Sequence, residues 1–558
     1  MGEKITLQME DWLYNSGLVG LYNILSFAGN RVITRGNCIE FDADDLQGFE
    51  EKYFNYLIEK YSDILSINKI ISFKEFILDN ENSNFENFTE KSLEFLNDEI
   101  IDSTKKYLKS NSYKAAYDLI DSSINVLELE KQLKKIKLSK KSSIKEIIPE
   151  IKANFEVLKK IIKFMELEES KKYIGAKNVI YIIIKNAWNG VSFLNPQTKE
   201  KNIYIDYKRY FLDPAIEYVN EEKSTYKYNC FTCNNKMNDL NGDLSFLNLT
   251  GFDVNRKTSH VWNFQNDVAV CPICKLVYSC VPAGITYFYD KGIYVNDNSS
   301  VINAVRINDR IYREIYKQGK EDNRLTYKGL VDAINEEFID KMKYELADIQ
   351  LIRYEDEEYK FNILSRKALS IIRESKEDLS KLVNCRLKEG DNYINIYELV
   401  LDRLLNNQNM FTLIQNLLYY KLSQPNDSYY NTYHILKILN INIRFLRGVG
   451  YMNGTYKDIV NEGNKSGIAL REQYRKKGAV DKLNGISYRL LNSLKTNNVD
   501  SFMDTLLNCH LYANLSVPEI FLDVLKSEEK FKTIGYAFVA GLIEEKKENE
   551  NGGDEVNE

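Results

Sequence analysis

The sequence predicts an α+β protein that is predominantly α-helical, and three observations support this fold class. Only seven prolines occur in 558 residues, and charged residues make up 28%, which favours long helices over a many-turned β-sandwich. Hydrophobic residues at 44% and aromatic residues at 12% supply enough side chains for packed cores and argue against general disorder. Strand-like patterns are concentrated at 31–41 and within 202–297. We therefore expect an N-terminal α/β region, a central region of short strands and a C-terminal bundle of five helices.

The length predicts several domains, because one hydrophobic core rarely serves more than about 250–300 residues. Changes in residue pattern indicate where the boundaries lie. We expect an N-terminal α/β-helical domain at 1–200, a cysteine-bearing region at 201–300, a helical domain at 301–450, a C-terminal helical bundle at 451–547 and a disordered acidic tail at 548–558.

The N-terminal pattern predicts one amphipathic helix followed by strands. Apolar residues recur at helical intervals across 10–28, and 31–41 is typical of a strand or hairpin. Residues 50–190 are largely periodic helix.

Short strands are predicted around the cysteines. β-Branched and aromatic residues occupy 203–205, 268–270 and 285–289, and the last is joined through 290–292 to another strand at 293–295. Residues 302–446 return to helices, with turn signals at 388–390 and 424–426.

The C-terminal block is predicted to contain five helices, at 455–476, 479–495, 499–513, 517–527 and 531–547. Ser516 and Glu519 have the spacing of a capping box for the fourth helix.

Charge and hydropathy exclude two classes of protein. The formal charge of -6 is not that of a protein that coats DNA unaided, so basic patches must be sought locally. The N-terminus lacks a basic stretch followed by an apolar core, and the longest apolar run, at 18–29, is too short to cross a bilayer. We expect a cytoplasmic protein with no membrane partner.

Two Cys-x-x-Cys pairs predict a metal site. Eight cysteines in 558 residues are too few for a disulfide scaffold, and four of them occur as Cys230–Cys233 and Cys271–Cys274, separated by 37 residues. Two such pairs can complete a tetrahedral four-thiolate shell, which is the chemistry of a structural Zn²⁺ ion. We therefore expect a zinc ribbon with an enlarged loop, while Cys38, Cys280, Cys385 and Cys509 are expected to serve packing.

The sequence offers no catalytic signature. Only three histidines occur, and none has the spacing of a metal-dependent nuclease or a zinc protease. The Gly463 to Ser466 stretch lacks the upstream glycine of a phosphate loop. We assign no catalytic residue and expect a protein that is not an enzyme.

Two basic segments are candidate nucleic-acid contacts. Residues 131–145 contain seven lysines and no acid, although a solvated surface is the alternative. Residues 452–500 contain nine basic and five acidic residues, with Tyr474 as a candidate for stacking on an unpaired base, and this block could equally dock an acidic partner. The candidates are Lys134, Lys137, Lys140, Lys141, Arg471, Arg475, Lys476, Lys477 and Lys482.

The order of these features resembles the large subunit of the type I-B CRISPR Cascade complex. The resemblance rests on the opening at 11–20 (DWLYNSGLVG), on the cysteine ribbon leading into 271–284 (CPICKLVYSCVPAG), and on the helical C-terminal domain. It implies a non-catalytic subunit that binds guide crRNA and target double-stranded DNA, assembles with CRISPR backbone and small subunits, recognises the protospacer-adjacent motif (PAM), begins R-loop formation and recruits a separate helicase-nuclease. Candidate PAM contacts are Arg31, Arg35, Asn37, Lys257, Asn263 and Gln265.

In this family the same gene can also produce the small subunit from an internal start. Met452 opens the C-terminal block, and 447–449 can be encoded as a purine-rich ribosome-binding sequence; Met410 is the rival start.

Two other functions are compatible with the sequence. One is a zinc-ribbon scaffold that binds proteins and no nucleic acid. The other is a nuclease that uses carboxylates without a recognisable motif.

Overall fold

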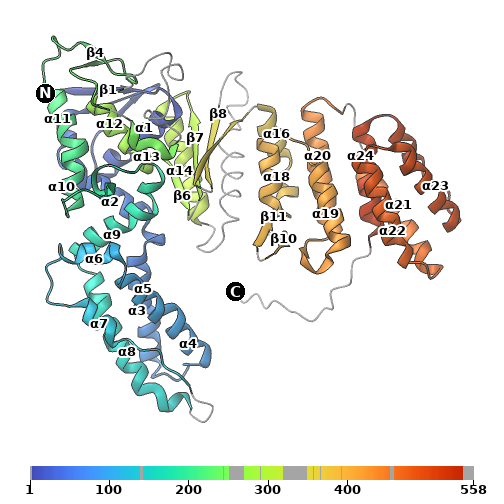
Figure 1. The fold of residues 1–558 in the computed structure, drawn as a ribbon, viewed down its shortest axis with the longest axis horizontal. Coiled ribbons are helices and arrows are strands. Elements are labelled where there is room, and N and C mark those ends of the chain that lie inside the picture. The colour runs from blue at the N-terminus through green and yellow to red at the C-terminus, as the bar shows by residue number, and fades with distance from the viewer. Residues whose placement is uncertain are drawn as a thin grey trace. The chain divides into compact units, whose positions relative to one another are not determined.

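The computed structural model describes residues 3–138, 143–242, 244–250, 269–288, 291–317, 349–355, 357–364, 366–390, 392–452 and 458–543. The described residues form two compact units: those up to Tyr312 together with Ile349–Phe361 form the first, and those from Asn362 onward together with 313–317 form the second. The fold is α+β and mostly helical, as the sequence predicts (Figure 1). The domain boundaries at 200, 300 and 450 stay predictions.

The first unit is built around α1 (Trp12–Phe27), which confirms the helix predicted at 10–28. Asp11 caps it, because its carboxylate accepts hydrogen bonds from the backbone N–H groups of Leu13 (2.8 Å) and Tyr14 (3.1 Å). Buried residues lie on every side of the helix, which is typical of a helix at the centre of a core.

The hairpin predicted at 31–41 is confirmed as β2 (Ile33–Arg35) and β3 (Cys38–Asp42). An unpredicted strand, β1 (Lys4–Gln8), pairs antiparallel with β3, so the sheet order is β1-β3-β2.

Helices α12 (Pro272–Ser279) and α13 (Val281–Gly284) pack on α1 at backbone contact distance. A Cβ atom added to Gly17 would lie 2.3 Å from the carbonyl oxygen of Val277, and one added to Gly20 would lie 2.1 Å from that of Cys280. From the other side, a Cβ at Gly284 would lie 1.9 Å from the Ser16 carbonyl oxygen. Only glycine therefore fits at these three positions.

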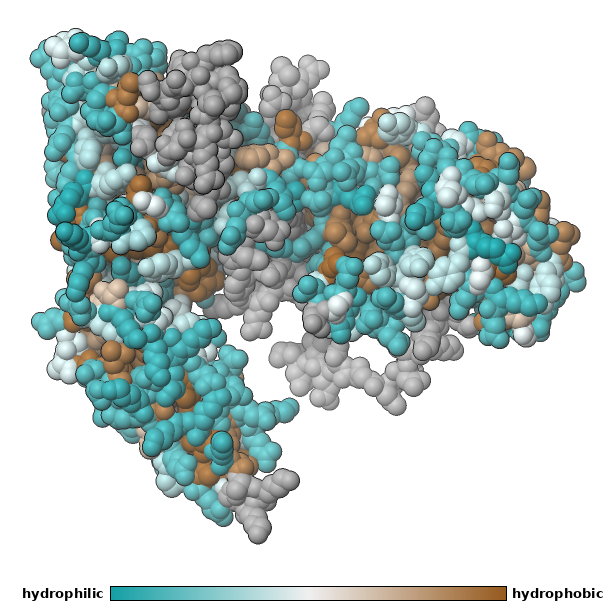
Figure 2. Space-filling view, viewed as in Figure 1, coloured by the Kyte–Doolittle hydropathy of each residue, from teal (hydrophilic) through white to brown (hydrophobic). Residues whose placement is uncertain are grey.

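The helices predicted at 50–190 are confirmed. Helices α3 to α8 lie together at one end of the first unit (Figure 1) and carry mainly hydrophilic residues on the face in Figure 2. The helices are α2 (Phe49–Lys60), α3 (Ser66–Asn82), α4 (Glu90–Glu94), α5 (Asp102–Leu108), α6 (Asn111–Tyr117), α7 (Val126–Gln132), α8 (Ile144–Met165) and α9 (Glu168–Ile182), with a π-helix at Phe95–Ile101.

The strand predicted at 203–205 is wrong. These residues begin α10 (Ile203–Tyr207), where the Asn202 side chain accepts a hydrogen bond from the Tyr204 N–H (3.0 Å) and so starts a helix in a β-branched sequence. A π-helix (Lys208–Leu212) and α11 (Asp213–Asn220) follow.

The predicted hairpin at 285–295 is confirmed as β6 (Thr286–Phe288) paired antiparallel with β7 (Lys291–Asp297). β7 also pairs with β8 (Ile349–Glu355), and the sheet order is β6-β7-β8-β9, with β9 at Glu358–Leu364. Helix α14 (Val301–Lys317) follows β7. In the predicted strand at 268–270, Ala269 and Val270 are not in a strand, and residue 268 lies outside the described residues.

The described residues of the second unit form helices and a small antiparallel sheet, and the turn predicted at 388–390 lies in that sheet. The elements before residue 452 are α16 (Arg366–Glu374), α17 (Lys376–Ser380), β10 (Arg386–Glu389), β11 (Asn392–Asn395), α18 (Ile396–Leu405), α19 (Phe411–Ser423), β12 (Ser428–Tyr429) and α20 (Thr432–Gly448), with a 3-10 turn at Pro425–Asp427.

The C-terminal block differs from the prediction at its fourth element. Helices α21 (Ile459–Lys476), α22 (Asp481–Lys495), α23 (Val499–Ala513) and α24 (Glu528–Leu542) correspond to four of the five predicted helices. The fourth is instead a 3-10 helix, Glu519–Leu525, whose N-cap is Pro518, so the predicted capping box is wrong. Proline has no side-chain acceptor, so the first backbone N–H groups of this helix receive no side-chain cap. The predicted tail at 548–558 lies outside the described residues.

Helix α24 is the centre of this block. It is buried along most of its length and packs closely on α21, where a Cβ added to Gly467 would lie 2.2 Å from the Phe538 carbonyl oxygen. Within the part of the chain that the structure describes, no helix is both long and apolar enough to cross a bilayer.

We expect Gly20→Ala to lower the free energy of unfolding of the first unit by ~1–3 kcal/mol or more, because the new methyl overlaps the Cys280 carbonyl oxygen. The matched control is Gly485→Ala in α22, where a Cβ meets no heavy atom within 4 Å and should raise stability by ~0.5–1 kcal/mol. Urea unfolding measures both variants, followed by tryptophan fluorescence for Gly20→Ala and by circular dichroism for Gly485→Ala, because the second unit contains no tryptophan. Equal stability of Gly20→Ala and wild type would contradict the close packing.

Candidate metal centre and basic surfaces

The first cysteine pair lies on a small hairpin. Strands β4 (Tyr228–Asn229) and β5 (Lys236–Met237) pair antiparallel on either side of it. The Cys230 N–H donates to the Asn235 carbonyl (2.8 Å), and Asn234 has a φ of 59°, a left-handed conformation that asparagine tolerates better than most residues. The hairpin therefore turns back directly after Cys233.

The second cysteine pair lies at the start of α12. Cys271 is the N-cap residue, and its Sγ accepts a hydrogen bond from the Cys274 N–H (3.5 Å). The Cys271 N–H in turn donates to the Cys230 Sγ (3.2 Å), which links the two pairs. The second pair thus departs from the predicted ribbon of short strands, because it opens a helix.

The four Sγ atoms have the spacing of one metal site. All lie within 4.8 Å of one another, and the Cys233 and Cys271 Sγ atoms are 3.6 Å apart. A metal–sulfur bond of about 2.3 Å in a tetrahedron places the sulfurs about 3.8 Å apart, so the cluster can hold a metal ion after small adjustments. Cys230, Cys271 and Cys274 are buried, and Cys233 is half-buried.

The ionisation of the four thiols is interdependent. Hydrogen bonds from the other three cysteines hold the pKa of Cys230 well below its usual range. Hydrogen bonding within the cluster, followed by burial, raises the pKa of Cys274 well above its usual value. Four adjacent thiolates require a cation to compensate their charge, which is what a bound metal ion supplies.

Residues of the N-terminal motif lie directly against the metal cluster. The Cys274 thiol donates to the Tyr14 hydroxyl (3.8 Å between Sγ and the hydroxyl oxygen), and burial raises the pKa of Tyr14, so this phenol stays protonated. Asp11 accepts a hydrogen bond from the Tyr278 hydroxyl on α12 (3.4 Å). The sequence did not identify these outer contacts, because about 260 residues separate the partners.

Aromatic side chains that are distant in the sequence also donate hydrogen bonds to backbone carbonyls of α12 and of the residue after α13. The Tyr53 hydroxyl (3.0 Å) and the Trp188 indole N–H (3.1 Å) both donate to the Ser279 carbonyl at the end of α12. The Tyr61 hydroxyl donates to the Ile285 carbonyl (3.0 Å). The metal centre is therefore continuous with the core of the first unit.

The basic segment at 131–145 is described at 131–138 and 143–145. Residues 133–138 follow α7 without regular secondary structure, and α8 begins at Ile144. Leu133 and Ile136 are buried. Two asparagine side chains bond its backbone: Asn154 accepts from the Lys134 N–H (3.2 Å) and donates to its carbonyl (2.9 Å), and Asn97 does the same at Ile136 (2.9 and 2.8 Å). The segment is therefore fixed on the surface.

The lysines of this segment differ in their partners. Lys131 pairs with Glu128, and Lys135 pairs with Asp98 and Asp102. The side chains of Lys134 and Lys137 are exposed and have no ion-pair partner among the described residues. Lys140 and Lys141 lie outside the described residues.

The predicted cations of α21 and α22 are mostly engaged within the second unit. Arg471 donates to the Ile543 carbonyl (2.6 Å) and Arg475 pairs with Glu472 (2.5 Å). The ammonium groups of Lys477 and Lys482 lie 5.2 and 4.8 Å from the centre of the Tyr512 ring. Lys476 is exposed.

The prediction that Tyr474 is free to stack on a base is wrong. Its side chain is 3% exposed, because it packs 4.9 Å from the Tyr512 ring, and Tyr512 is the residue at the surface.

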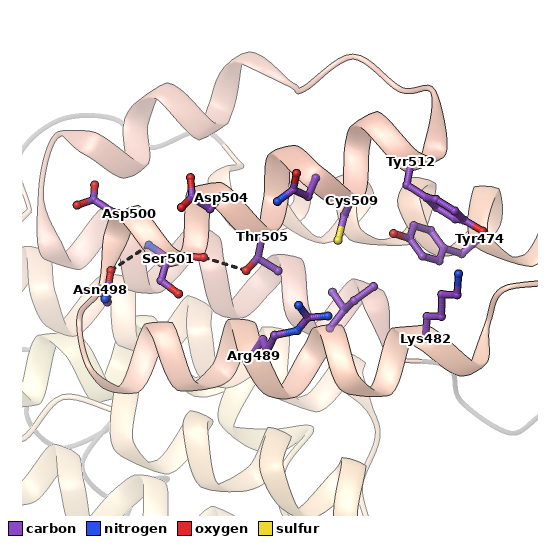
Figure 3. A pocket seen from close by; sticks show the side chains of 12 residues that line it. Tyr474, Lys482, Arg489, Asn498, Asp500, Ser501, Asp504, Thr505, Cys509 and Tyr512 are labelled. Carbon is purple, nitrogen blue, oxygen red and sulfur yellow. Dashed lines mark hydrogen bonds between the residues drawn. The ribbon is translucent and has the colours of Figure 1, made fainter.

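A groove of about 810 Å³ runs between α22 and α23, with Tyr474 and Tyr512 at one end (Figure 3). Lys482 and Arg489 lie on α22, whereas Asp500 and Asp504 lie on α23. Because both signs of charge are present, this groove does not suit a phosphate backbone alone.

The candidate PAM residues can be placed only in part. Arg31, Arg35 and Asn37 are exposed, the last two beside the β2–β3 turn at Gly36, where φ is 60°. Lys257, Asn263 and Gln265 lie outside the described residues.

We expect Cys230→Ser to lose its stoichiometric bound metal and to melt at a lower temperature. The substitution removes a buried metal ligand that links the β4–β5 hairpin to the start of α12. The matched control is Cys38→Ser, a half-buried thiol outside the cluster, which should keep both properties. Metal analysis and thermal denaturation measure the two variants. A Cys230→Ser protein with full metal content and unchanged melting would contradict the site.

Comparison with known proteins bears on this same region. Residues 223–286 match the model of a protein family described as CRISPR-associated protein (Cas_CXXC_CXXC). No curated protein and no solved structure matches the chain. The matched segment contains both cysteine pairs, the β4–β5 hairpin and helices α12 and α13. Residues 223–286 are therefore similar to the CXXC–CXXC region of CRISPR-associated proteins.

Proposed function

We propose that this protein is the non-catalytic large subunit of a type I-B CRISPR Cascade complex. In this role it binds guide crRNA and target double-stranded DNA, recognises the PAM, begins R-loop formation, and recruits a separate helicase-nuclease. The observation that carries the proposal is the CRISPR-associated match at 223–286. The N-terminal motif at 11–20 supports it, because Asp11, Tyr14, Gly17 and Gly20 contact the matched helices directly. Two distant parts of the resemblance thus form one structural element.

We propose Zn²⁺ as the ion of the cysteine cluster. Four thiolates in a tetrahedron suit this ion and leave no coordination position for water. When bound, the ion supplies folding free energy and neutralises the thiolates. Cys230 and Cys233 hold the hairpin to α12, Cys271 and Cys274 begin the helix, and Tyr14 orients the Cys274 sulfur.

The exposed cations support a nucleic-acid partner. Lys134 and Lys137 project from a segment whose backbone is fixed at four hydrogen bonds, so little further ordering is needed when they meet a phosphate backbone. Sequence recognition in RNA-guided complexes comes mainly from base pairing, so the protein needs few base contacts.

The described histidines support a role without catalysis. The ring of His434 accepts a hydrogen bond from the Asn431 N–H (3.1 Å) at the start of α20. His510 is buried, and its Nδ1 bonds the Leu506 carbonyl (2.9 Å). Both rings are engaged in hydrogen bonds with their own helices.

The C-terminal block is also proposed to be made separately from Met452 as the small subunit. Met452 lies just before α21 and is 4% exposed. A Met452→Leu gene should no longer yield the short chain; if it still does, Met410 or proteolysis replaces this start.

The direct test is to sequence the RNA that co-purifies with the C-terminally tagged protein from its native host. We expect short guides of uniform length that share one repeat-derived end. Absent or random RNA on intact, metal-loaded protein would contradict the proposal and favour a metal-stabilised scaffold that binds only proteins.

A variant pair makes this test specific for the basic segment. Lys134→Ala/Lys137→Ala should retain less RNA or target DNA during a salt wash, because each phosphate contact contributes to the salt dependence of binding. Lys131→Ala is the control, since this lysine already pairs with Glu128 and should behave as wild type.

A further inference from the structure

The small sheet of the second unit has an exposed face that carries aromatic and basic side chains. Its strand order is β11-β10-β12, and all neighbours are antiparallel. In this register Arg386 faces Asn395 and Tyr429, and Lys388 faces Tyr393. Side chains alternate between the two faces of a strand, so these five residues share one face.

The opposite face of the same sheet is buried. Leu387, which lies between Arg386 and Lys388, is 5% exposed, and Ser428 beside Tyr429 is 7% exposed. The sheet therefore packs its apolar side on the core of the second unit and leaves the tyrosine side to solvent.

The exposed face contains a defined cluster. The Arg386 guanidinium carbon lies 4.8 Å from the centre of the Tyr393 ring and 5.0 Å from that of Tyr429. The two ring centres are 5.7 Å apart, with an angle of 61° between the rings. Cation–π contact with Arg386 restricts both rings without burying them.

The exposure of these rings is high for aromatic side chains. Tyr393 is 52% exposed and Tyr429 is 43% exposed, although Arg386 covers part of each. Two rings held side by side on a rigid sheet lose little conformational freedom when a further planar group stacks on them. Large apolar surface left open in this way is typical of an interaction site.

The charges around the cluster identify the class of partner. Arg386 is exposed and Lys388 is half-buried with no ion-pair partner among the described residues. Two carboxylates are also near: Glu389 ends β10, where the Tyr420 hydroxyl lies 3.4 Å from its Oε1, and Asp427 precedes β12. The cations lie on the face itself, next to the rings, which suits planar groups linked by phosphates.

We propose that Arg386, Lys388, Tyr393 and Tyr429 form a stacking platform for the unpaired bases of single-stranded DNA. Sheet faces that display aromatic side chains bind bases by stacking, while neighbouring cations contact the phosphates. The choice of DNA rests on the proposed function, because pairing of a guide with its target leaves a displaced DNA strand unpaired. Duplex DNA does not fit, since its bases are already stacked on one another.

The test measures binding of the full-length, metal-loaded protein to a fluorescent oligodeoxythymidylate by anisotropy. Removing both rings in Tyr393→Ala/Tyr429→Ala should weaken binding at least tenfold, because each stacked base contributes ~1–3 kcal/mol. Tyr393→Phe/Tyr429→Phe keeps the ring faces and should bind within about twofold of wild type. An abasic oligonucleotide of equal length should bind the wild type and the alanine variant equally, because it has phosphates and no bases.

Tyr181→Ala is the matched control, because Tyr181 is 47% exposed and lies on α9 in the first unit. It should bind the oligonucleotide as wild type does. Circular dichroism of each variant checks that the overall fold is intact, which is expected since the altered side chains are at the surface.

Three results would overturn the platform: unchanged binding by the double alanine variant, equal loss for the abasic probe, or dependence on the two tyrosines for an oligoribonucleotide but not for the DNA. The first of these, obtained on protein that still co-purifies with guide RNA, would remove the platform and leave the proposed function intact. If guide RNA is absent but DNA binding still depends on the two tyrosines, the platform stands and the proposed function is wrong.

Discussion

The first unit depends on the contact between α1 and the helices that follow the second cysteine pair. Gly17, Gly20 and Gly284 bring the two backbones together, so neither helix can shift along the other without a steric clash. The cysteine cluster fixes the start of α12, and hydrogen bonds from Tyr53 and Trp188 fix its end. A metal ion bound by the four thiols would therefore position the centre of the unit as well as the β4–β5 hairpin. This arrangement explains why the N-terminal motif and the cysteine region occur together, although 260 residues separate Tyr14 from Cys274.

Local signals predicted much of the fold and the metal ligands. The cysteine pairs were identifiable because a Cys-x-x-Cys turn is defined within four residues, and α1 because its apolar pattern extends over several turns. Elements that depend on distant partners were not predictable. Strand β1 needs β3, thirty residues later, and the sequence at 203–205 favours a strand until Asn202 caps it as a helix.

Burial was the other property that the sequence did not specify. Tyr474 is an aromatic residue in a basic segment, which suggested base stacking, yet its ring is buried inside the second unit. Tyr393 and Tyr429 are exposed on a short sheet, in a region where the sequence indicated only turns. Basic residues showed the same dependence on structure. Arg471 and Arg475 are engaged within the second unit and Lys135 within the first, whereas Lys134 and Lys137 face solvent. A count of charges along the chain therefore overestimates the cations available to a nucleic acid.

The most direct test of the central claim is native-state hydrogen exchange of the full chain with and without its bound metal. If the metal holds α12 against α1, removing it with a chelator should increase amide exchange in α12 and also in α1, while α21 and α24 of the second unit stay protected. Increased exchange confined to the β4–β5 hairpin, with α1 unchanged, would contradict the claim, because the metal would then stabilise the hairpin alone.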